Sequence, residues 1–250
     1  MKFEPNPKAV MSLWWLGQSG YLVHHAGNWL CFDPYLSDSL TRKYANTAKP
    51  HVRMKPIVIA PQELDFVDVA TSTHNHTDHL DAETLKAMKP KRLIIPEANR
   101  AFVADRLGCD PAWPTGLQIG ETKTEAGFTF TAVPAAHETL TPSTIGYIVK
   151  AGGITIYHSG DTLLYESQAQ IIRGFNVDLA ILPINGKVGN MDHRDAASLA
   201  KAIGAKLTIP CHYDMFEFNT ADPDDFRAAA SELGIAHQVL QLGARFDMFG

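Results

Sequence analysis

The chain has little that would mark a nucleic-acid-binding, membrane or disulfide-stabilised protein. Only three of its 250 residues are cysteines, and an odd, widely spaced set does not form a disulfide framework. The formal net charge is −5 and no tract is rich in lysine or arginine, which disfavours general binding to nucleic acid or to a membrane surface. No apolar run approaches the length of a membrane span. The sequence G-x-S-x-G is also missing, so no serine nucleophile of that kind is expected.

The first residues carry no clear export signal. Pro5 and Pro7 interrupt them, and the apolar patch that follows is too short for a secretory signal. We therefore expect a cytoplasmic protein that contacts neither membrane nor nucleic acid and acts on a small molecule.

Strand and helix signals follow one another in an order typical of an α/β protein. Apolar runs rich in β-branched and aromatic residues predict strands at 12–25, 28–36, 66–73, 91–96, 128–135, 144–151, 154–160, 177–184 and 205–212. Capping residues predict helices at 82–89, 97–108, 191–204 and 221–234, for which Asp81, Asp192 and Asp222 are N-caps. Strands first, then alternating strands and helices, indicate mixed sheets covered by helices. We expect one domain over 1–250, with two stacked sheets and outer helices.

The ten residues STHNHTDHLD, at 72–81, concentrate groups that bind metal ions. His74 and His76 are two apart, so on an extended backbone both imidazoles face the same way. Asp78 and His79 follow where the strand gives way to a helix, and they can approach from another side. Imidazole and carboxylate are ligands for zinc, iron and manganese. Four candidates in six positions exceed what one tetrahedral site takes from a single loop, so we expect two adjacent metal ions.

Three further candidates each lie at the end of an apolar run. His137 follows FTFTAVPAA, Asp161 follows ITIYHSG, and His212 follows AKLTIPC. A sheet brings the ends of its strands to one rim, and the shared position of these residues predicts that they join the first cluster. Cys211, next to His212, would face the opposite way on a strand and is expected to be a core thiol.

This pattern resembles the metallo-β-lactamase superfamily over nearly the whole chain. The resemblance implies an αββα sandwich, with two mixed β-sheets flanked by helices. It also implies a ligand set: His74, His76 and His137 for one metal, Asp78, His79 and His212 for the second, and Asp161 as the bridge. Asp33, at the end of WLCFDP, resembles the aspartate that supports the metal loop from behind; its alternative role is a turn residue before Pro34.

Several stretches are similar to the ascorbate-6-phosphate lactonase-like branch of that superfamily, namely WLGQSGYLV, FDPYLSDS, LPINGKVGNMD and HYDMFEFNT. This resemblance implies hydrolysis of a lactone or related ester on a phosphorylated, sugar-like molecule. It suggests manganese and a homo-oligomer, whereas the superfamily at large suggests zinc, and the ligand types also admit iron.

The expected chemistry is metal-assisted hydrolysis. Two divalent ions outweigh the charges of Asp78 and Asp161, so the site attracts a small anionic substrate. A bound metal lowers the pKa of water from 15.7 to about 7 and supplies hydroxide, while a second ion can polarise the oxygen under attack. We expect Asp78 to remain a ligand and to help handle the proton.

Substrate contacts are expected on the same rim. Asn185 and Lys187 lie on the loop after residues 177–184, and Tyr213 follows a predicted ligand. Structural roles are equally open to Lys187 and Tyr213. Lys43, which follows DPYLSDSL, could reach an anion but is more typical of surface charge.

Other functions remain open on the sequence alone. A two-metal site also suits a phosphodiesterase for a cyclic nucleotide or another small molecule. An iron-dependent oxidoreductase on the same fold is another alternative, although diiron members replace the second histidine of the motif by a carboxylate, and His76 is present here. An antibiotic-hydrolysing lactamase would be exported. A structural zinc site would be closed by four ligands, fewer than the seven candidates in this chain.

Overall fold

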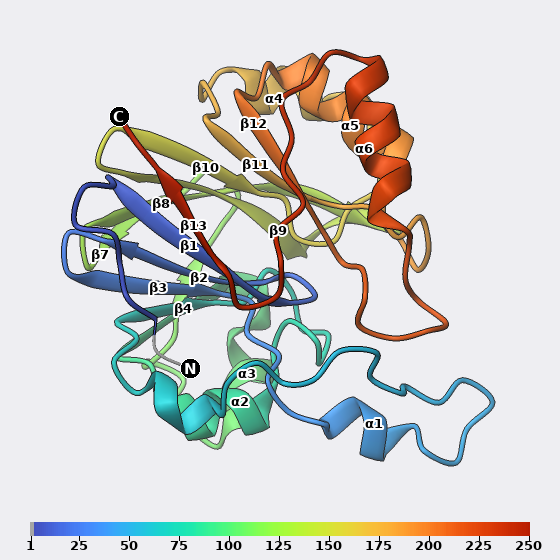
Figure 1. Ribbon diagram of the computed structural model, residues 1–250. Coiled ribbons are helices and arrows are strands. Elements are labelled where there is room, and N and C mark those ends of the chain that lie inside the picture. Colours follow the sequence, from blue (N-terminus) through green and yellow to red (C-terminus); the bar gives the residue numbers. More distant parts are fainter. Residues whose placement is uncertain (1–2) are drawn as a thin grey trace.

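The computed structural model describes residues 3–250. Two β-sheets pack face to face, and helices cover their outer faces (Figure 1). The first sheet contains β1 (Met11–Gly17), β2 (Gly20–His25), β3 (Asn28–Phe32), β4 (Val69–Thr71), β5 (Arg92–Pro96), β6 (Thr115–Leu117) and β13 (Arg245–Met248). The second contains β7 (Thr122–Glu125), β8 (Phe128–His137), β9 (Thr139–Ala151), β10 (Ile154–His158), β11 (Leu179–Pro183) and β12 (Leu207–Cys211).

Both sheets are mixed. The first has the order β13-β1-β2-β3-β4-β5-β6, antiparallel from β13 to β3 and parallel from β3 to β6. The second has the order β12-β11-β10-β9-β8-β7, parallel from β12 to β10 and antiparallel beyond. This is the metallo-β-lactamase fold, so the predicted αββα sandwich is confirmed.

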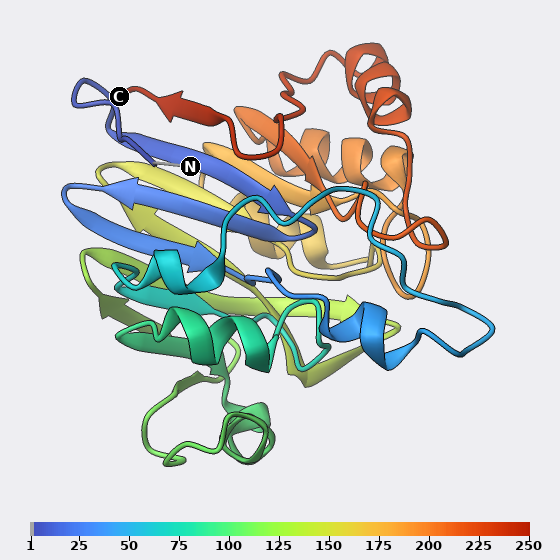
Figure 2. The same ribbon diagram turned by 60° about the horizontal axis from the view of Figure 1, so that its bottom comes forward.

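The helices lie outside the two sheets, and all but the first form the two outer layers (Figures 1 and 2). They are α1 (Ser39–Lys43), α2 (Ala82–Met88), α3 (Arg100–Leu107), α4 (Gln168–Arg173), α5 (His193–Ile203) and α6 (Pro223–Glu232), with short 3₁₀ turns η1 (Pro61–Leu64) and η2 (Glu97–Asn99). The side chains of Asp81, Asp192 and Asp222 accept backbone N–H bonds at the first turns of α2, α5 and α6, so the predicted N-caps are confirmed. Among the described residues, no helix is long and apolar enough to cross a membrane.

The sequence of strand β1 is mostly apolar and does not alternate between apolar and polar residues. Leu13 and Trp15 pack into the core between the sheets, while Trp14 and Leu16 pack into the layer beneath α2 and α3. Both faces of the strand are therefore buried. The opening apolar run also contains a tight turn at Gln18–Ser19, which separates β1 from β2.

Candidate metal centre

The segment after β4 carries four predicted ligands, but it is not extended. Strand β4 ends at Thr71, and residues 73–80 form bends and turns. The extended backbone expected at His74 and His76 is therefore not found. Their rings nevertheless lie together, with centroids 4.7 Å apart, because the folded loop turns both inward.

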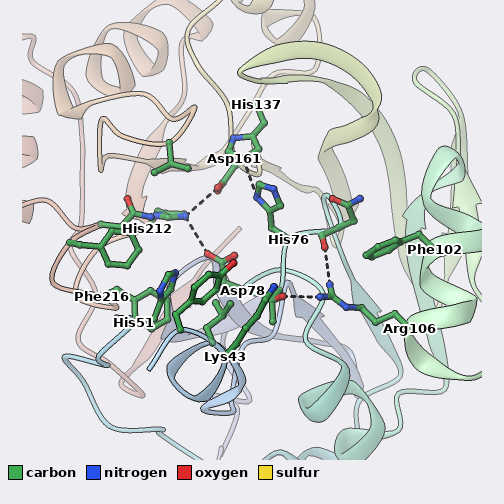
Figure 3. Close-up of a pocket in the computed structure, with 17 residues that line it drawn as sticks. Lys43, His51, His76, Asp78, Phe102, Arg106, His137, Asp161, His212 and Phe216 are labelled. Atoms are coloured by element: carbon green, nitrogen blue, oxygen red, sulfur yellow. Dashed lines mark hydrogen bonds and ion pairs between the residues drawn. The ribbon is translucent and has the colours of Figure 1, made fainter. Parts of the chain in front are cut away.

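The predicted ligands converge from both sheets. His137 is the last residue of β8, Asp161 lies three residues beyond β10, and His212 follows β12 directly. Donor atoms form three groups, each within 4.8 Å: His74, His76 and His137; His74, His79 and Asp161; Asp78, His79 and His212. His74 and His79 each belong to two groups, so the donors make one continuous cluster at a common cavity (Figure 3).

Several donor atoms of this cluster are buried without a hydrogen-bond partner in residues 3–250, among them His74 Nε2, His79 Nε2 and Asp161 Oδ1. The last two lie 3.2 Å apart but lack the alignment of a hydrogen bond. Buried polar atoms normally have partners. Burial lowers the pKa of His74 well below its ordinary value, which keeps the ring neutral and a nitrogen lone pair available. These donors fit a divalent metal ion.

Asp33 lies beneath the loop at the end of β3 and is fully buried. Its Oδ1 accepts from Thr71 Oγ1 (3.0 Å) and Thr73 N (3.1 Å), and its Oδ2 accepts from His79 Nδ1 (2.8 Å) and Thr73 Oγ1. A carboxylate can only accept, so the His79 proton is assigned to Nδ1. This bond turns Nε2 of His79 toward the cluster, as supporting carboxylates do in metal sites.

The carboxylates and imidazoles of the cluster shift one another's pKa values. Burial would raise the pKa of Asp161, but His212 and His79 hold it well below its usual range. Burial would lower the pKa of His79, but Asp161 and Asp78 raise it well above its usual value. A metal ion and a proton therefore compete for the same nitrogen of His79.

Gln18, in the turn between β1 and β2, is a member of the site that sequence reasoning missed. Its side chain Nε2 donates to Asp78 Oδ2 (2.8 Å) and lies 3.1 Å from His212 Nε2. Its backbone oxygen accepts from His212 N (3.2 Å). Its neighbours in the sequence give no signal of this role, and only the structure shows it as a buried residue at positive φ in the turn. Gln18 thus ties Asp78 to His212 across the two sheets.

The cluster opens on a cavity of about 400 Å³ (Figure 3). Beyond the predicted ligands, its walls include Lys43, Tyr44, His51, Phe102, Phe216 and Phe218. Arg106 also lines it, but its guanidinium donates to Asn75 O and Thr77 Oγ1 and so holds the metal loop. Lys43 has its Nζ 5.0 Å from the Tyr44 ring centroid, at the cavity rather than on remote surface.

The predicted substrate-contact residues do not line this cavity. Asn185 is buried, and its Nδ2 donates to Oδ1 of Asn219, which does line it (2.8 Å). Lys187 is exposed, with its Nζ 3.5 Å from Phe218 O. Tyr213 points elsewhere: its ring stacks on Trp15 with centroids 4.6 Å apart, beside a separate cavity. The structure does not bring these three side chains together with the predicted ligands.

Comparison with known proteins identifies the family. Residues 28–213 match the family described as a β-lactamase superfamily domain. A relative from Caldivirga maquilingensis, named a metal-dependent hydrolase, is 29% identical over 221 residues, which cover 88% of this chain and 89% of the relative.

Two solved structures share the fold. Igni18, described as a metallo hydrolase from Ignicoccus hospitalis, has a TM-score of 0.71 at 24% identity, covering 95% of this chain and 98% of that one. YhfI from Bacillus subtilis, described as a metallo-β-lactamase fold protein, has a TM-score of 0.69 at 18% identity, covering 95% and 99%. The chain therefore belongs to the metallo-β-lactamase superfamily, among relatives named as metal-dependent hydrolases.

Proposed function

We propose that this protein is a metal-dependent hydrolase that holds two divalent ions and cleaves a lactone or related ester of a small anionic molecule such as a phosphorylated sugar. The observation that carries the proposal is the set of overlapping donor groups at the floor of a small cavity. His76 and His137 belong to the first group, and Asp78 and His212 belong to the third. Asp161 belongs to the second group, which shares one histidine with each of the others.

This overlap supports the ligand assignment that the resemblance implies. His74, His76 and His137 would hold one ion, Asp78, His79 and His212 the other, and Asp161 would bridge them. Asp161 lies near members of both sets, which supports this bridge. It shares a donor group with His74 of the first set, and its Oδ1 and Oδ2 each lie 3.2 Å from the second set, at His79 Nε2 and His212 Nε2. Nitrogen and oxygen donors of this kind accept manganese, zinc or iron.

Ions in such a site supply hydroxide at neutral pH and polarise the oxygen under attack. Side chains of the protein hold the proposed ligands in position by hydrogen bonds. Gln18 holds Oδ2 of Asp78, and the Asp78 side chain lines the cavity, where its carboxylate can take a proton. Asp33 holds the His79 ring from below.

The size of the cavity and the charge at its wall favour a small anionic substrate. A volume of about 400 Å³ suits a small molecule and is too small to enclose a polymer. The Lys43 ammonium at its wall offers a contact for an anionic group, since Arg106 already holds the loop and Arg42 pairs with Glu83 on the surface.

The test is turnover by metal-stripped protein restored separately with manganese, zinc or iron. The panel contains phosphorylated sugar lactones, cyclic nucleotides and a phosphodiester, and His76→Ala serves as the control. Lactone turnover that needs metal and is lost in the control is the expected result. Lactone turnover that survives a chelator would refute the metal mechanism, and turnover of the phosphodiester alone would establish a phosphodiesterase instead.

A further inference from the structure

Residues 39–54 form an arm of the chain that begins with α1 (Figures 1 and 2). Its side chains at Leu40, Lys43, Tyr44 and His51 line one wall of the cavity. The arm is tied down at several points. Thr41 Oγ1 donates to His51 O (2.6 Å), Arg53 Nε donates to Asp38 Oδ1 (3.1 Å), and Met54 N donates to Met215 O (2.8 Å). The side chains that it presents to the cavity are therefore positioned by the fold.

His51 is a polar residue of this arm that packs among aromatic rings. Its ring stacks on Tyr44 with centroids 4.2 Å apart and an interplanar angle of 20°. It meets Phe216 and Phe218 edge-on, at 5.0 Å and 4.5 Å. Figure 3 shows His51 and Lys43 on the side of the cavity away from His137, with Asp78 between. No part of the metal chemistry described above uses this side chain.

The tautomer of His51 follows from the one hydrogen bond that its ring makes within residues 3–250. Nδ1 lies 3.0 Å from Lys49 O, and because a carbonyl oxygen only accepts, Nδ1 must carry the proton. Burial lowers the pKa of the imidazole, so the ring is neutral at pH 7. A neutral ring with its proton on Nδ1 has a free lone pair on Nε2, and the His51 side chain lines the cavity.

We propose that His51 binds the substrate by accepting a hydrogen bond at Nε2 from a substrate hydroxyl. Tyr44 and Phe218 then offer apolar surface to the carbon skeleton beside that hydroxyl, and Lys43 faces the anionic group. The arm thus selects a hydroxylated, anionic substrate while the opposite wall performs the hydrolysis. This assignment rests on the proposed hydrolase function and names the part of the substrate remote from the reacting carbonyl.

The test is calorimetric binding of two probes to the metal-loaded protein. 6-Phosphogluconate carries hydroxyls, whereas 6-(phosphonooxy)hexanoate has the same chain length and charges without them. His51→Phe keeps the ring contacts but removes the acceptor, and His51→Gln restores an acceptor. His237→Phe is the matched control, because His237 Nδ1 makes the same kind of bond to Ile235 O (2.9 Å) away from the cavity.

We expect His51→Phe to weaken 6-phosphogluconate binding about 3- to 10-fold, as loss of one neutral hydrogen bond predicts. His51→Gln should recover most of that loss, and 6-(phosphonooxy)hexanoate binding and metal content should not change. Equal weakening of both probes, or no weakening of either, would overturn the assignment. So would failure of the wild-type protein to bind 6-phosphogluconate, although metal-dependent ester turnover would then leave the hydrolase function standing.

Discussion

Asp33→Asn tests whether the support beneath the loop controls the metal centre. The carboxylate accepts hydrogen bonds from four donors. The Thr73 amide cannot reverse its direction, and His79 Nδ1 can accept only if its proton moves to Nε2, the nitrogen that a metal needs. An amide has one accepting oxygen, so in this fully buried position its NH₂ must face either a fixed donor or the His79 ring in the tautomer that blocks metal binding. Hydrogen bonds to charged groups contribute about 1.5–3 kcal/mol and those between neutral groups about 0.5–1.5 kcal/mol. We expect a loss of about 2–4 kcal/mol in the free energy of unfolding.

The same substitution should weaken metal binding about 10- to 100-fold, as removal of such supporting partners does. Competition with a chromogenic chelator measures the affinity, and urea unfolding of metal-free protein measures stability. Asp68→Asn is the matched control: Asp68 accepts from Trp29 N (2.8 Å) and Lys91 Nζ (2.7 Å) just before β4, at the end opposite the cluster. If Asp33→Asn kept wild-type metal affinity, or if Asp68→Asn lost as much, the reasoning would be refuted.

Other perturbations probe the same centre. Gly160→Ala places a Cβ 2.7 Å from Thr73 Cβ at a φ of +62°, so it should weaken metal binding. Its control, Gly204→Ala, has a φ of +69° and open space around the new Cβ, so it should cost only about 1–2 kcal/mol of stability. Equal metal affinities of the two variants would contradict this expectation. Gln18→Met removes the donor to Asp78 and should lower affinity for one of two ions about 10-fold in the chelator assay. Removing metal that was present at 100 times its Kd should lower the thermal midpoint by about 5–10 °C in calorimetry. Metal affinity should rise with pH up to the raised pKa of His79, because below that pKa the ring holds a proton that the metal must displace. Calorimetry in two buffers of different ionisation enthalpy would show the released proton. A binding enthalpy that is the same in both buffers would contradict the assignment of His79 as a ligand.

The donors of the cluster could be predicted from sequence because their positions are set locally. His137 and His212 come at the ends of recognisable apolar strands, and the histidines of the loop lie within six positions of one another. The backbone of that loop was harder to predict. Its bends depend on Asp33, which is 40 residues from Thr73 in the chain.

The residues that sequence reasoning missed act through long-range contacts. Gln18 reaches Asp78 and His212 from 60 and 194 positions away, and nothing in its neighbours reports this. His51 lies on an arm without helical or strand periodicity, so only the contacts with Phe216 and Phe218 show that it faces the cavity. Helix α1, with five residues, is too short for a periodic pattern.

Strand β13 was also missed, and its position bears on how the protein is made. It pairs with β1, and Asp247 accepts from Ser12 Oγ (2.7 Å) and Asn6 Nδ2 (2.9 Å). During synthesis, β1 therefore keeps an unpaired edge until residues 245–248 leave the ribosome, although its own apolar side chains emerge much earlier. An open strand edge of this kind recruits other chains. The nascent protein should therefore depend on chaperones until β13 is made, and variants that lack β13 should aggregate.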